Sequence, residues 1–326
     1  MFSRILVRAT NWVGDAVMSL PALGAVRECF PQAEIAVLAR PWVGGLYARE
    51  SAIDHVIPYD GVKWSLVRRL RGERFDCAIL LQNAFEAALI ARLAGIPRRI
   101  GYDRDGRGWL LTDAIPVPKP GEIPRHERFY YLELLRRAGI LDALPQADPI
   151  RLESVEGAPS LVRPVIGVSP GAAYGNAKRW KPESFAEAAG QLASARSASV
   201  VMFGSEGERE LCEHVANLLR ARGVSVENLA GRTSLAEFIE LAAACEVFLT
   251  NDSGAMHIAS ALGVPTVSVF GATDDAATGP VSPRARVVRE PVECSPCLLR
   301  ECPIDHRCMT RVTPARVVAA ALDLLK

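Results

Sequence analysis

The segment Val247–Leu262 reads VFLTNDSGAMHIASAL. Its apolar first residues, Val247–Thr250, predict a β-strand, and Gly254–Leu262 predicts a helix. A strand that runs through a short polar turn into a helix is the repeating unit of parallel sheets with crossover helices. The segment therefore predicts an α/β fold.

The same alternation continues on both sides of this segment. In the second half, further strands are predicted at Val165–Val168, Ser199–Phe203 and Thr266–Phe270, and helices at Pro182–Ala195, Glu206–Arg222, Leu235–Ala244 and Thr313–Leu325. In the first half, strands are predicted at Arg4–Thr10, Glu34–Ala39 and Asp76–Leu81, and helices at Ala22–Phe30, Ala84–Leu93 and His126–Ala138. The sequence thus predicts two Rossmann-like, doubly wound parallel-sheet domains.

The length supports two domains. The chain has 326 residues, about twice a common domain length. Periodicity is weak over residues 141–164, and we expect the junction there. The expected parts are an N-terminal domain over residues 1–155, a C-terminal domain over residues 160–312 and a closing helix over residues 313–326. Ligands of open α/β sheets bind at the carboxyl ends of the strands, so we expect the site in a cleft between the domains.

Composition excludes several classes of protein. Hydrophobic residues make up 49% and charged residues 23%, which argues against disorder and coiled-coil rods. The formal net charge of +1 argues against a nucleic-acid partner. The start, MFSRILVRATNW, does not read as a signal peptide, and no apolar run is long enough to span a membrane. We expect a cytoplasmic protein with reduced thiols.

The first candidate motif, NWVGDAVMSLP, occupies Asn11–Pro21, directly after the first predicted strand. Gly14 allows a ligand to approach the backbone closely, and Asp15 is expected at the strand-to-helix turn. A carboxylate there can accept a proton from a substrate. The alternative is that Asp15 only caps a helix.

The second motif is the Asn-Asp-Ser-Gly turn of the opening segment. Backbone N–H groups of Ser253, Gly254 and Ala255 are expected to bind a diphosphate at the start of the helix. Asp252 would repel phosphate, so it either caps the helix or accepts hydrogen bonds from sugar hydroxyls. His257 lies one turn further on and could reach a phosphate oxygen, although a lone helical histidine is often only packed.

The third motif, SPGAAYGNAKRWKP, occupies Ser169–Pro182. Lys178 and two neighbouring cations suit a diphosphate, unless they form only a solvated face. Gly171 is one of two glycines expected to keep this loop open. Glu208 follows the next strand, where an acidic residue can bind ribose hydroxyls. Neither GxGxxG nor a P-loop is present.

Four cysteines lie close together near the C-terminus, as Cys294-x2-Cys297-x4-Cys302-x5-Cys308 with His306 between them. Such a cluster could bind zinc or an iron–sulfur cluster, but the spacing matches no common metal motif. Reduced structural thiols and local disulfides are the alternatives.

Taken together, these motifs resemble the heptosyltransferases of glycosyltransferase family 9, over nearly the whole chain. The resemblance is greatest to the ADP-heptose:lipopolysaccharide enzymes that add the second heptose. First-heptose enzymes carry two threonines in the third motif, where this sequence has Ala173 and Tyr174. The resemblance implies a GT-B fold, with the acceptor on the N-terminal domain and ADP-heptose on the C-terminal domain.

The resemblance also implies roles for individual residues. Asp15, beside Gly14, corresponds to the proposed catalytic base. Lys178 would contact the donor phosphates and Glu208 the ribose. The Asp-Ser-Gly-x-x-His pattern around the donor corresponds to Asp252, Ser253, Gly254 and His257.

The implied reaction is transfer of heptose from ADP-L-glycero-D-manno-heptose to the first heptose of the lipopolysaccharide inner core. A single displacement with one carboxylate predicts inversion, and fixed cations and dipoles make a metal or other cofactor unnecessary. The basic runs Lys63–Arg74 and Arg98–Arg107 could attract an anionic acceptor at the inner membrane, where peripheral contact is possible. The alternatives are a first- or third-heptose enzyme or another family 9 transferase, a GT-B-like sugar-nucleotide epimerase, and a non-catalytic nucleotide- or metal-binding module.

Overall fold

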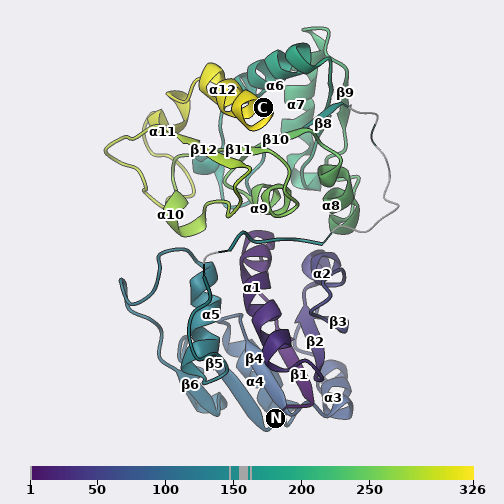
Figure 1. The fold of residues 1–326 in the computed structure, drawn as a ribbon, viewed down its shortest axis with the longest axis vertical. Coiled ribbons are helices and arrows are strands. Elements are labelled where there is room, and N and C mark those ends of the chain that lie inside the picture. Colours follow the sequence, from purple (N-terminus) through teal and green to yellow (C-terminus); the bar gives the residue numbers. More distant parts are fainter. Residues whose placement is uncertain (1, 147, 154–160, 162–163) are drawn as a thin grey trace. The chain divides into compact units, whose positions relative to one another are not determined.

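The computed structural model describes residues 2–146, 148–153, 161 and 164–326. The chain forms two compact units, Met1–Asp148 and Pro149–Lys326, and each is described by itself (Figure 1). The expected domain limits at residues 155 and 160 lie outside the described residues, so they stay predictions.

The first unit contains one six-stranded parallel sheet in the order β3-β2-β1-β4-β5-β6. Its strands are β1 (Arg4–Arg8), β2 (Glu34–Ala39), β3 (His55–Pro58), β4 (Cys77–Leu80), β5 (Arg98–Tyr102) and β6 (Asp113–Ile115). Its helices are α1 (Val13–Cys29), α2 (Pro41–Tyr47), α3 (Trp64–Glu73), α4 (Phe85–Leu93), the short 3-10 helix η1 (Gly108–Leu110) and α5 (Arg128–Arg137). One face of the sheet packs against α3, α4 and η1.

The second unit repeats this architecture, with the strand order β12-β11-β10-β7-β8-β9. Its strands are β7 (Val165–Ser169), β8 (Ser199–Met202), β9 (Val226–Asn228), β10 (Val247–Asn251), β11 (Thr266–Phe270) and β12 (Ala285–Arg289). Its helices are η2 (Asn176–Lys178), α6 (Pro182–Arg196), η3 (Glu206–Glu208), α7 (Arg209–Arg220), α8 (Leu235–Ala243), α9 (Gly254–Ala261), α10 (Asp275–Thr278), α11 (Arg307–Thr310) and α12 (Pro314–Leu324). Two doubly wound parallel sheets confirm the predicted fold class.

The burial of the central strands explains why the sequence predicted them. Strand β7 is buried along its whole length, and β1 from its second residue on. A strand covered on both faces needs a continuous apolar run, which stands out in a sequence. Sequence analysis missed the partly buried strands, which have no such continuous apolar run: β3, β5, β6, β9 and β12.

Helix α1 differs from the prediction. It begins at Val13 rather than Ala22, and Pro21 lies inside it. Proline removes one backbone hydrogen bond, so the sequence pattern favoured a start after it. Burial of Val17, Met18 and Leu20 outweighs that loss.

The direction of the strands determines where the candidate residues gather. All strands of a parallel sheet end at the same edge, so the motifs that follow β1, β7, β8 and β10 lie at the carboxyl edges of their two sheets. Among the described helices, none is long and apolar enough to cross a membrane.

Candidate functional site

Lys178 lies in a loop of the second unit, residues 170–181. Buried side chains fix this loop through hydrogen bonds. The Asn251 side chain, at the end of β10, donates to the carbonyl of Pro170 (2.7 Å) and accepts from the Trp180 backbone N–H (2.9 Å). The Trp180 indole is 1% exposed, and its Nε1 donates to the Val312 carbonyl at 2.9 Å. The loop is therefore fixed at both ends.

Lys178 and Asp252, which are far apart in the sequence, form an ion pair. Lys178 Nζ lies 2.6 Å from Asp252 Oδ2, and the two side chains are 14% and 5% exposed. Thr273 Oγ1 donates to the same carboxylate oxygen at 2.5 Å. An ammonium has three N–H donors, so the pair leaves Lys178 with donors for a further anion.

The expectation that Asp252 could cap the following helix is wrong. Ser253 occupies the N-cap position of α9, because its backbone is extended there (φ −152°, ψ 169°). The Asp252 carboxylate points instead to Lys178 and Thr273.

The start of α9 has the character of an anion site. Within the described part of the chain, no side chain caps this helix, and Ser253 Oγ lies 3.0 Å from Thr250 Oγ1. The first-turn N–H groups, those of Gly254 and Ala255 included, keep the partial positive charge of a helix N-terminus. His257 lies in the next turn and is buried.

Glu208 follows β8 and lies at the carboxyl edge of the second sheet, as Asp252 and Ser253 do. Its Oε2 accepts from the Ser205 backbone N–H and hydroxyl, both at 2.8 Å, which fixes η3 as the start of α7. A Cβ atom on Gly171 would lie only 2.0 Å from Glu208 Oε1. Glycine at position 171 thus admits the carboxylate of Glu208, which is a more specific role than the open loop that the sequence suggested.

Asp15 and Gly14 lie in the first unit, in the first turn of α1. Trp12 occupies the N-cap position, so Asp15 is not the helix cap. A carboxylate in a first turn is stabilised by the helix dipole and can still act on a ligand.

A second carboxyl group, Glu127, was not singled out by sequence analysis. Burial raises the pKa of Glu127 to about 7, and the negative charge of Asp15 adds to the effect. Two carboxyl groups that share a site resist joint ionisation. No pattern in the sequence indicates this pair, because 112 positions separate its members.

Comparison with known proteins identifies the family. The family model described as "Glycosyltransferase family 9 (heptosyltransferase)" matches residues 63–307. The chain belongs to glycosyltransferase family 9. It is therefore a glycosyltransferase, as the sequence motifs indicated.

Individual family 9 relatives agree. Lipopolysaccharide heptosyltransferase 2 of Salmonella typhimurium is 36% identical over an alignment of 310 positions that covers 88% of each chain. Lipooligosaccharide heptosyltransferase 2 of Campylobacter jejuni is 28% identical and covers 99% of this chain and 98% of its own. The solved structure of ADP-heptose lipopolysaccharide heptosyltransferase II from Escherichia coli is 34% identical and covers 99% of this chain and 98% of its own, with a TM-score of 0.84. The GT-B fold of these enzymes is confirmed for this chain.

The cysteine-containing segment of this family 9 chain supports the Lys178 loop. The Arg300 carbonyl accepts from the Ala177 N–H at 3.0 Å, and a Cβ on Gly175 would lie 2.3 Å from that carbonyl oxygen. Two cations lie close to the Tyr174 ring: Lys178 Nζ is 4.8 Å and Arg300 Cζ 5.3 Å from its centroid. Tyr174 thus places an aromatic ring against the lysine.

The four thiols lie near one another, but no three of them come within 4.8 Å of one another. All eight cysteines are free, and burial together with the three nearby thiols raises the pKa of Cys308. Among the described residues, a single group brings three potential metal ligands within 4.8 Å of one another, and it contains no cysteine.

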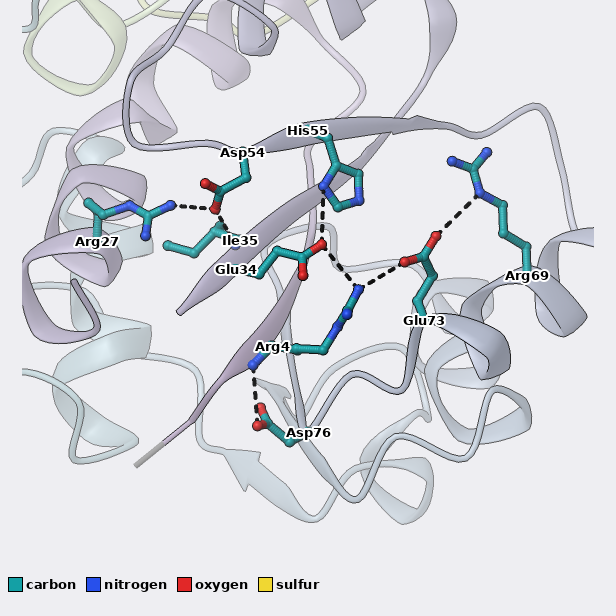
Figure 2. Close-up of polar contacts among 9 residues, drawn as sticks. All are labelled: Arg4, Arg27, Glu34, Ile35, Asp54, His55, Arg69, Glu73 and Asp76. Atoms are coloured by element: carbon teal, nitrogen blue, oxygen red, sulfur yellow. Dashed lines mark hydrogen bonds and ion pairs between the residues drawn. The ribbon is translucent and has the colours of Figure 1, made fainter. Parts of the chain in front are cut away.

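That group, Glu34, His55 and Glu73, lies at the amino edge of the first sheet (Figure 2). The Arg4 guanidinium already stands between the two carboxylates, with Nη2 at 3.1 Å from Glu34 Oε1 and 2.9 Å from Glu73 Oε2. Asp76 accepts from the Arg4 backbone N–H at 3.2 Å. We interpret the group as an ion-pair network that ties strand starts together, since a cation already occupies its centre.

Proposed function

We propose that this protein transfers heptose from ADP-L-glycero-D-manno-heptose to the first heptose of the lipopolysaccharide inner core. The observation that carries the proposal is the similarity, along nearly the whole chain, to enzymes named heptosyltransferase 2. The site geometry supports it, because a paired lysine and an uncapped helix start at one edge suit a diphosphate.

The proposed reaction is a single displacement. The acceptor hydroxyl oxygen bonds to the anomeric carbon while the bond from that carbon to ADP breaks and its electron pair stays on the β-phosphate. Asp15 accepts the hydroxyl proton, a role worth roughly 10²–10⁴ in rate. One displacement inverts the configuration of the anomeric carbon.

The donor is assigned to the second unit. Lys178 and the N–H groups at Ser253, Gly254 and Ala255 stabilise the charge that grows on ADP, without a metal ion. Glu208 accepts hydrogen bonds from the ribose hydroxyls, and His257, one turn into α9, binds a phosphate oxygen.

The acceptor is attached to lipid, so the proposal includes peripheral contact with the cytoplasmic face of the inner membrane. Eight free thiols fit a reducing compartment.

The test is product analysis with ADP-heptose and a core oligosaccharide that ends in the first heptose. We expect one added heptose with inverted anomeric configuration and an unchanged rate in EDTA. Asp15→Ala should bind ADP normally and lose transfer, whereas Asp142→Asn, an exposed aspartate of the same unit, serves as control. Retained transfer in Asp15→Ala would refute the assignment of the base, and release of heptose without acceptor would point to another reaction.

A further inference from the structure

Five large aromatic side chains of the first unit are exposed, and each follows a different strand. We name them the aromatic row. In the order of the strands β3, β2, β1, β4 and β5, they are Trp64, Trp42, Trp12, Phe85 and Trp109, with exposed fractions of 66%, 57%, 59%, 41% and 66%. Trp64 and Phe85 begin the helix after their strand, Trp12 caps α1 and Trp42 is the second residue of α2. Trp109 lies in η1.

Contacts link two pairs of neighbours in the row. Trp42 Nε1 donates to the carbonyl of Asn11, beside Trp12, at 2.9 Å. The Phe85 and Trp109 ring centroids are 6.3 Å apart. Adjacent strands lie about 4.8 Å apart, so four intervals span roughly 19 Å. The row is longer than one sugar ring and suits a chain of several.

Most tryptophans of this chain are exposed, although a tryptophan side chain is largely apolar. Four of the five tryptophans of the chain belong to the row, and the fifth, Trp180, is buried. Large exposed apolar side chains that gather at one edge of a sheet mark a candidate interaction site.

Cations lie among the rings. Arg40 Cζ is 5.5 Å from the Trp42 ring, and Arg92 Cζ is 5.9 Å from the Trp109 ring. Lys63 directly precedes Trp64. Arg40 pairs with Glu86 at 3.7 Å and Lys63 with Asp60 at 2.5 Å. Each cation keeps further N–H donors that can bind a carboxylate or phosphate group on a ligand.

Most cations of the two basic runs lie elsewhere or serve the fold. Helix α3 runs back to the amino edge, where its last residue, Glu73, pairs with Arg4. Arg98 pairs with Asp113 at 2.9 Å, and Arg107 is fully buried. Of the cations in the two basic runs, Lys63 is therefore the one that we place beside the aromatic row.

We propose that the aromatic row binds the sugar rings of an anionic oligosaccharide acceptor, an inference that rests on the proposed function. The negative face of an indole attracts the polarised C–H groups on the apolar face of a sugar. Trp12 stands three positions before Asp15, so a sugar stacked beside it presents its hydroxyl near the proposed base.

A bilayer surface is the competing partner, since tryptophan also favours membrane interfaces. The row, however, shares its loops with Asp15, Asp60 and Glu86. Asp60 pairs with Lys63 and Glu86 with Arg40, so these charges cancel and give no net attraction to an anionic bilayer. Stacking of a sugar on an aromatic ring needs no net charge. The charge pattern favours the oligosaccharide.

The test uses Trp42→Ala and Trp64→Ala, both distant in sequence from Asp15, with calorimetric binding of lipid-free core oligosaccharide as the main readout. We expect affinity to fall about five- to tenfold for each variant, the acceptor KM to rise equally, and kcat and the ADP-heptose KM to stay within about twofold. Trp42→Tyr should restore most of the affinity. Leu322→Ala, an exposed apolar residue of α12, is the matched control.

Other outcomes overturn the inference. Wild-type affinity in both alanine variants, or no oligosaccharide binding by the wild type, contradicts it. So does a loss confined to co-sedimentation with phosphatidylglycerol vesicles, which would assign the row to the membrane. If the variants weaken binding but the wild type transfers no heptose, the proposed function fails and the aromatic row stands.

Discussion

Replacing Glu127 by glutamine should stabilise the protein at alkaline pH. The pKa of Glu127 is about 7 in the folded protein, whereas its ordinary value is 4.5. An acid whose pKa is raised by folding loses its proton more readily in the unfolded chain, so it lowers stability as pH rises from about 4.5 and reaches its full cost above about 7. At about 1.4 kcal/mol per pH unit, that cost is about 3 kcal/mol.

Urea unfolding of wild type and Glu127→Gln at pH 4.5 and pH 8.5 measures this effect. At pH 8.5 we expect the variant to be more stable by up to about 3 kcal/mol, and at pH 4.5 the difference should fall below about 1 kcal/mol. Because the charge of Asp15 contributes to the raised pKa of Glu127, the gain should be smaller in an Asp15→Asn background.

Glu122→Gln is the matched control. The Lys119 backbone N–H and the Arg137 side chain lower the pKa of Glu122, so removing its charge should reduce stability at pH 8.5. Equal stability of wild type and Glu127→Gln at both pH values would refute the reasoning about Glu127.

Three further predictions concern packing and the donor site. Gly171→Ala should weaken ADP binding at least about tenfold in calorimetry while leaving the far-ultraviolet circular dichroism unchanged, because its Cβ would lie 2.0 Å from Glu208 Oε1. Thr273→Val should destabilise the second unit by about 1–3 kcal/mol in urea unfolding, since it removes the 2.5 Å hydrogen bond to buried Asp252; an unchanged midpoint would contradict this. Arg107→Met should cost at least about 3 kcal/mol, because the buried guanidinium donates to the carbonyls of Tyr102, at the end of β5, and Gln82, in the loop after β4. A wild-type melting temperature would contradict that expectation.

Local patterns in the sequence determined the architecture of both units and the turns that carry chemistry. Long apolar runs marked the central strands, and the Gly-Asp and Asp-Ser-Gly turns marked where Gly14, Asp15 and Ser253 would lie. These predictions succeeded because a buried strand and a strand-to-helix turn depend on neighbouring residues.

Tertiary structure alone decided which residues meet. The Lys178–Asp252 ion pair, the fit of Glu208 against Gly171 and the effect of Asp15 on Glu127 all join separate crossovers. The aromatic row also depends on strand order, since its members follow the sheet and not the chain. Periodicity describes what each segment buries, whereas these contacts depend on which strands lie side by side, and no single segment encodes that order.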